Sequence, residues 1–163
     1  MTRHQWIFLL LLFLLLPLSC LFAQTLSFTD ILKVYSLDSN AARQFCTGKN
    51  LALTAAGNTG ATMRYQFIAA DSSGTKLEIN YPNDSTSLNV QLNYWFKSAK
   101  EYSHFKKAIP KNGFTRQSVK QVAGALPSYA ERYVSKNLQI ELIHPEGKQP
   151  YWLFLHPVGN YTW

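Results

Sequence analysis

Hydrophobic residues recur at a helical period in two short segments after residue 25, and this pattern predicts two helices. Ser27 and Asp30 have the spacing of a capping box, so the first helix is expected to begin after Ser27. The second helix is expected to begin at Asp38 or Ser39. It is expected to end at Gly48, because glycine is favoured just past a helix end.

From residue 51 onward, hydrophobic and polar residues alternate, which predicts half-buried strands. The clearest alternation is Leu88–Phe96, where Leu92 and Tyr94 belong to the inner face and Trp95 to the outer one. The other runs of this first half lie at residues 63–69 and 77–81, separated by polar turns.

A third helix is expected after Ser98, which forms a second capping box with Glu101. Pro110 is expected to end this helix. Its predicted inner stripe is Ala99, Tyr102, Phe105 and Ile109. Four further strands are predicted at Phe114–Gln121, Ser128–Ser135, Leu138–Ile143 and Tyr151–His156.

The order of these elements predicts an α+β fold, with one large antiparallel sheet or two abutting sheets and helices packed on one face. The second half repeats the first weakly: Phe45 corresponds to Phe105, and Arg64-Tyr65 to Arg132-Tyr133. We therefore expect a tandem repeat of a helical segment plus about four strands, with units at 27–96 and 97–157. The alternative is that two amphipathic halves are alike by chance.

This order of elements resembles the beta-lactamase-inhibitor-protein-like architecture, through the Phe45/Phe105 and Arg64-Tyr65/Arg132-Tyr133 correspondences. The resemblance implies helices over one sheet face and an opposite face free for a protein partner. It carries no inhibitory residue over to this chain. The chain also lacks the disulfides of such secreted inhibitors.

Residues 1–23 have the layout of a secretory signal peptide: a short basic start, an apolar block and small residues near Ala23. Cleavage after Ala23 leaves one domain, residues 24–163, in a secreted or periplasmic location. Two alternatives stay open, a retained membrane anchor and lipid attachment at Cys20. If Cys20 leaves with the leader, Cys46 is expected to be a buried, inert thiol with no intramolecular partner.

The domain without its leader is basic, with 15 Lys and Arg residues against 9 Asp and Glu residues. Much of the excess lies in Lys97–Lys120, which we call the basic stretch. It would suit an anionic membrane surface or polymer, or it is a solvated helix face. Nucleic acid is not expected as a partner of an exported protein. One stripe of this stretch has helical spacing and contains Lys97, Lys100, His104, Lys107 and Lys111.

No metal site, cofactor or catalytic motif is predicted. His144 and His156 are expected to lie far apart along the last hairpin, which argues against zinc. A pair of Glu141 and His156 is the one acid–base candidate, and a surface His–Glu contact is its plainer interpretation.

Large aromatic residues are predicted on the outer face of the sheet, among amides. This pattern favours an exported, non-enzymatic binding module for an unidentified protein or ligand. The alternative class is an envelope-associated protein that binds anionic lipid or polymer through the basic stretch, and a further alternative is that helices or the tail cover the aromatic rings. The expected contact residues are Trp95, Trp152, Phe154, Gln91 and Asn93.

Overall fold

The computed structural model describes residues 26–70, 74–84, 89–122, 128–145 and 150–159. The leader predicted at 1–23, with the candidate lipidation site Cys20, lies outside the described residues. The same holds for the tail from residue 160.

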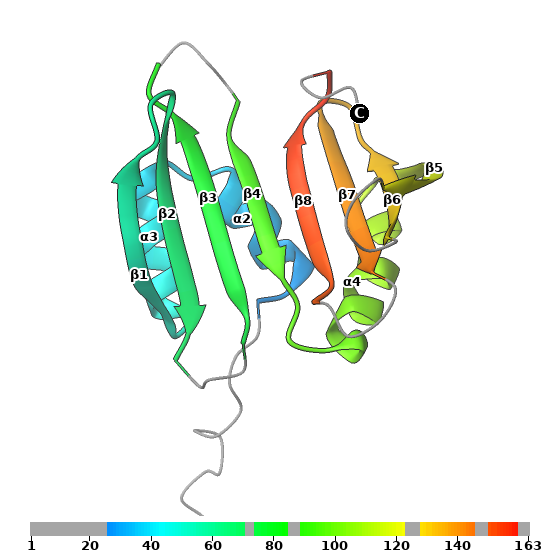
Figure 1. The fold of residues 1–163 in the computed structure, drawn as a ribbon, viewed down its shortest axis with the longest axis horizontal. Coiled ribbons are helices and arrows are strands. Elements are labelled where there is room, and N and C mark those ends of the chain that lie inside the picture. The colour runs from blue at the N-terminus through cyan, green and yellow to red at the C-terminus, as the bar shows by residue number, and fades with distance from the viewer. Residues whose placement is uncertain (1–25, 71–73, 85–88, 123–127, 146–149, 160–163) are drawn as a thin grey trace, which may run out of the picture.

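Three helices and eight strands form two layers, with the helices behind the sheet in Figure 1. The helices are α2 (Phe28–Tyr35), α3 (Ser39–Gly48) and α4 (Ala99–Lys111). The strands are β1 (Leu51–Asn58), β2 (Thr62–Ala69), β3 (Lys76–Pro82), β4 (Gln91–Trp95), β5 (Thr115–Val122), β6 (Ser128–Val134), β7 (Leu138–Pro145) and β8 (Trp152–Pro157).

All eight strands belong to one antiparallel sheet in the order β1-β2-β3-β4-β8-β7-β6-β5. The chain is therefore an α+β protein, and of the two predicted arrangements the single sheet is the one that forms. The first four strands follow α2 and α3, and the last four follow α4. The last strands of these two halves, β4 and β8, pair with each other at the centre.

The register across this central seam brings hydrophobic residues opposite one another. Leu92 lies opposite Leu155, and Tyr94 lies opposite Leu153. Each edge strand also carries an irregularity in its pairing, between Leu53 and Ala55 in β1 and between Arg116 and Ser118 in β5. Such bulges increase the local twist of a strand, and they are common at sheet edges.

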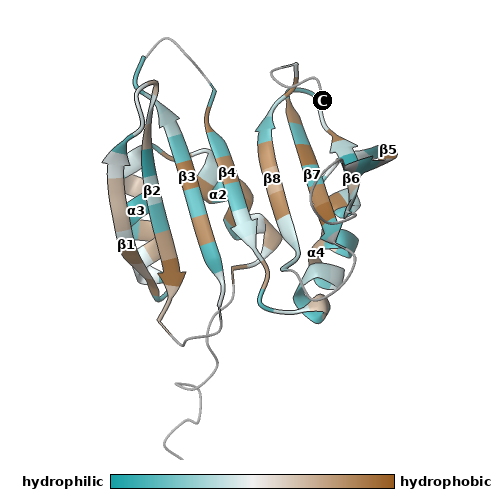
Figure 2. Ribbon diagram, in the orientation of Figure 1, coloured by the Kyte–Doolittle hydropathy of each residue, from teal (hydrophilic) through white to brown (hydrophobic). Residues whose placement is uncertain are grey.

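The core lies between the helices and the sheet, and strand alternation selects its members. Hydrophobic and polar bands alternate along the central strands in Figure 2. Most side chains on the helix side of the four central strands are buried. The completely buried members there are Leu77, Ile79, Leu92, Tyr94, Ile140, Leu142, Leu153 and Leu155.

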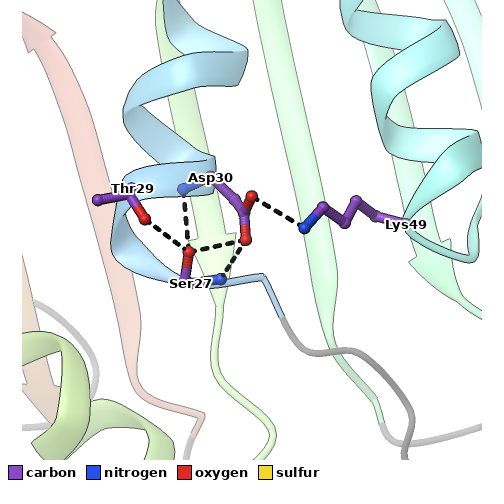
Figure 3. A network of polar contacts seen from close by, with 4 residues as sticks. All are labelled: Ser27, Thr29, Asp30 and Lys49. Atoms are coloured by element: carbon purple, nitrogen blue, oxygen red, sulfur yellow. Dashed lines mark hydrogen bonds and ion pairs between the residues drawn. The ribbon is translucent and has the colours of Figure 1, made fainter.

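The capping box predicted for the first helix is present. The Ser27 hydroxyl accepts a hydrogen bond from the Asp30 amide at 3.1 Å, and the Asp30 carboxylate accepts one from the Ser27 amide at 2.9 Å. Lys49, just past the end of α3, adds an ion pair to Asp30 at 3.0 Å (Figure 3). These contacts fix the start of α2 against the end of α3.

The second predicted capping box forms only in part. The Ser98 hydroxyl accepts from the Glu101 amide at 3.2 Å, but the Glu101 carboxylate does not complete the box. It accepts instead from the Tyr94 hydroxyl at 2.6 Å and from the Lys97 amide at 2.9 Å. Glu101 is buried by these partners, whereas Ala99, which was expected in the inner stripe, is exposed.

Two predicted boundaries also change. The strand expected over Leu88–Phe96 is shorter, because only Gln91–Trp95 form the ladder of β4. The third helix continues past Pro110 to Lys111, with the proline in its last turn. A proline there still stops propagation, and Gly113 at φ 83° then turns the chain into β5.

Cys46 is completely buried on α3, and burial raises the pKa of its thiol to about 12. Because the thiolate is the reactive form, we expect Cys46 to react with a disulfide reagent at least about a hundredfold more slowly than free cysteine. Thiol labelling of the Cys20→Ser protein with and without denaturant measures this rate. Equal rates in the two conditions would contradict the buried placement.

Candidate functional site

The five residues predicted to make contacts share the face of the sheet opposite the helices, which we call the helix-free face. Trp95 on β4 lies directly opposite Trp152 on β8, and Asn93 lies opposite Phe154. Gln91 is two residues before Asn93 and thus on the same face. All five side chains are half-buried, so each keeps part of its surface accessible.

The two tryptophans occupy the closer type of cross-strand pair. The Phe96 amide donates to the Tyr151 carbonyl at 2.9 Å, so the next pair inward, Trp95 and Trp152, is not hydrogen-bonded. In antiparallel sheets, side chains at such positions stand nearest to each other. The seam between the two halves thus carries two neighbouring tryptophans on the helix-free face.

Polar side chains border the tryptophans on the β2–β4 side. The Gln66 amide group donates to the Glu78 carboxylate at 2.8 Å, and Asn80 donates to its other oxygen at 3.4 Å. The Lys76 ammonium lies over the Trp95 ring, 4.5 Å from its centroid. A cation at this distance is attracted to the ring, so Lys76 restricts the orientation of Trp95. The sequence pattern did not single out these neighbours, although their alternation with buried residues places them on this face.

The helix-free face is buried over β7 and the end of β8, so only part of this face is open. Glu141 is 2% exposed and accepts hydrogen bonds from Arg132 at 3.0 and 3.1 Å and from Gln139 at 2.8 Å. Phe154 stacks on His156 with the ring centroids 4.6 Å apart. The accessible part of the helix-free face therefore narrows to β2–β4 and the tryptophan pair.

The structure buries both members of the acid–base pair proposed from the sequence, Glu141 and His156. His156 is completely buried, and its Nδ1 lies 2.9 Å from the Pro157 carbonyl oxygen. Burial lowers the pKa of His156, against the opposing effects of that hydrogen bond and of Glu141. The expected surface contact between Glu141 and His156 is wrong, since both side chains are buried.

Lys97, Lys100, His104, Lys107 and Lys111, which we call the basic stripe, lie just before α4 and along its outer side. Lys97, Lys100, Lys107 and Lys111 are all exposed, as a solvated face or an anion-binding surface requires. Among the residues that the structure describes, none of these four forms an ion pair. Two other cations of the basic stretch differ, because Lys106 forms an ion pair with Glu131, and Arg116 does so at 3.3 Å.

Glu131 is buried, and hydrogen bonds and nearby cations stabilise its charged form. Burial raises its pKa, but hydrogen bonds from Lys106 and Tyr133 and the charges of Lys106 and Arg116 outweigh it, so the net pKa is lowered. A lowered folded-state pKa stabilises the protein above the ordinary glutamate range, and this contribution is lost as the pH falls through the lowered value.

Glu131→Gln is therefore expected to lower the free energy of unfolding at pH 7 by about 1 kcal/mol. The difference between variant and wild type should shrink as the pH falls through the acidic range, because both then carry a neutral group. Urea unfolding across that pH range measures both quantities. A difference that grows toward low pH would contradict the lowered pKa.

Within the described ranges, no three or more His, Cys, Asp or Glu side chains gather where they could hold a metal ion. Within the same ranges, no helix has both the length and the apolar character needed to cross a membrane.

Comparison of the chain with protein-family models, with curated protein sequences and with solved structures finds no match. The fold offers two candidate surfaces, the helix-free face and the outer side of α4.

Proposed function

We propose that the protein is an exported, non-enzymatic binding module whose contact surface is the tryptophan pair of the helix-free face. The observation that carries the proposal is the placement of Trp95 directly opposite Trp152, half-exposed and away from the helices. Tryptophan is enriched at binding hot spots, because it buries a large area and freezes few torsions. Asn93 and Gln91, on the same strand, supply polar groups that orient a partner.

The rim of this surface suits a protein or ligand with both apolar and polar parts. Glu78 is held by Gln66 and Asn80, and Lys76 is held over Trp95, so the polar groups have fixed positions. Preorganised side chains lose less entropy when a partner binds, which favours affinity. Export of the domain is part of the proposal through residues 1–23.

We also infer that the two halves are a tandem repeat. The bulges of β1 and β5 lie at the same place in each half, and the central register is unchanged when the halves are exchanged. Aligned by the bulges, Gln66 takes the place of Arg132, and each faces a glutamate on the next strand, Glu78 or Glu141. In this alignment Arg132 corresponds to Gln66, which is two residues after Arg64, the residue that the sequence pattern matched with it.

The repeat and the single helix-covered sheet keep the beta-lactamase-inhibitor-protein-like architecture as a proposal for the fold relationship. In that architecture the helix-free face meets a protein, so a protein is the first partner class to test here. The alternative function is attachment to anionic lipid or polymer through Lys97, Lys100, Lys107 and Lys111, whose exposure without ion pairs in the described part of the chain favours it.

The two proposals predict opposite responses in a capture experiment with immobilised protein and the envelope fraction of the cells that produce it. If the sheet face binds, Trp95→Ala/Trp152→Ala should reduce capture of a specific species by at least about tenfold. Capture by the wild type should persist at about 1 M salt, where the Debye length is about 3 Å.

Val119→Ala/Tyr129→Ala is the matched control, since both residues are exposed and hydrophobic but lie on the helix side of β5 and β6. All three proteins must melt at similar temperatures, so that lost capture is not lost folding. Capture that disappears in high salt and is indifferent to the tryptophan substitutions would instead support the basic stripe.

A further inference from the structure

A groove between the start of α2 and the outer side of α4 is separate from the helix-free face. Its volume is about 480 Å³, within the range of roughly 300–1,000 Å³ that is usual for small-molecule sites. Side chains from both helices and from the segments flanking them line the groove, among them Leu26, Phe28, Lys97, Lys100, Phe105 and Ala108.

The floor of the groove is apolar. Leu26, Phe28 and Phe105 reach it from the edge of the core, and Ala108 extends it along α4. The rings of Phe28 and Phe105 meet edge to face with their centroids 5.9 Å apart, so the floor is a firm surface. The small side chain of Ala108 leaves the space above this surface unfilled.

The rim of the groove is cationic at the start of α4. Lys97 and Lys100 are exposed there and form no ion pair in the described part of the chain, and His104 lies one turn further on. Glu101 is the one acidic residue among the groove's lining residues. Both of its carboxylate oxygens already accept hydrogen bonds, from Tyr94 and from the Lys97 amide.

Because the floor of the groove is apolar and its rim is cationic, we propose that the groove binds a single-chain amphiphile of the fatty-acid kind. Its anionic head group lies against Lys97 and Lys100, and its hydrocarbon chain lies over Phe28, Phe105 and Ala108. Charge complementarity selects the head group, and burial of apolar area stabilises the chain. The proposed site includes only part of the basic stripe, because Lys107 and Lys111 do not line the groove.

The test is a fluorescence titration of the whole protein with a dansyl-labelled undecanoic acid, and with its methyl ester as an uncharged probe. The acid is expected to bind, and the ester to bind about tenfold more weakly. Lys97→Gln/Lys100→Gln should raise the Kd of the acid about tenfold. Lys107→Gln/Lys111→Gln removes the same charge further along α4, outside the groove, and should change the Kd by less than about twofold.

A third variant, Ala108→Phe, fills the groove and should weaken the binding of acid and ester alike, with its melting temperature as the check on folding. Four results would overturn the proposal. They are no binding of the acid, equal binding of acid and ester, equal effects of the two lysine pairs, or displacement of the acid by an equal concentration of inorganic phosphate.

Discussion

Leu155→Ala is expected to lower the free energy of unfolding by about 2–5 kcal/mol, the largest effect we expect from a single hydrophobic truncation in this chain. Leu155 is completely buried and lies between Leu92 on β4 and Ile140 on β7, at the seam of the two halves. Its removal leaves a cavity that strands on both sides are too constrained to fill. Urea unfolding followed by circular dichroism measures the loss.

Leu53→Ala on the edge strand β1 is the control, since Leu53 is 39% exposed and its truncation should cost no more than about 0.5 kcal/mol. Both variants should unfold in one transition, because a single sheet and core join the two halves. Equal losses for Leu155→Ala and Leu53→Ala, or two separate transitions, would contradict the central position of β8.

Arg132→Met is expected to lower the free energy of unfolding by about 3 kcal/mol. The guanidinium donates two hydrogen bonds to one oxygen of Glu141, which is 2% exposed on the helix-free face. Without the arginine, a carboxylate remains buried without its opposing charge, and this costs more than the ion pair itself contributes. Thermal or urea unfolding of the variant gives the number.

Two further variants separate this cause from a general loss of arginine. Arg64→Met removes an exposed arginine from the same face and should cost less than about 0.5 kcal/mol. Arg132→Met/Glu141→Leu replaces the whole pair by apolar groups and should recover most of the loss. If the double variant is less stable than Arg132→Met, the buried charge is not the source of the effect.

Local patterns were sufficient to predict most of the elements and many of their inward-facing residues, although Ala99 was wrongly placed in the inner stripe of the third helix. Alternation assigned Leu92 and Tyr94 to the inner face, and the spacing of Ser27 and Asp30 predicted the first cap. These features depend on residues close together in the sequence, where side-chain period and backbone hydrogen bonding act directly.

The features that the sequence did not predict depend on contacts between different helices and strands. The Glu101 carboxylate does not complete its capping box because it accepts a hydrogen bond from the Tyr94 hydroxyl, which belongs to the sheet. Glu141 is buried because Arg132 reaches it from the neighbouring strand. The groove lies between α2 and α4, about 70 residues apart in the chain, and no local period encodes such a juxtaposition.

The pairing of β4 with β8 has the same origin. Alternation predicts which residues of a strand face the core, but it does not say which strand lies beside it. The sequence therefore left one sheet and two abutting sheets as alternatives. It identified both tryptophans as outward-facing, but their direct opposition depends on the central pairing.

Site-specific photo-crosslinking in the cells that produce the protein tests directly whether the helix-free face binds a partner. A benzophenone amino acid replaces Asn93, beside the tryptophan pair, or Lys107, on the outer side of α4. We expect a covalent adduct of defined mass from position 93 and none from position 107, with the adduct lost when Trp152→Ala is added. An adduct from position 107 alone, or from neither position, would contradict the helix-free face as the binding surface.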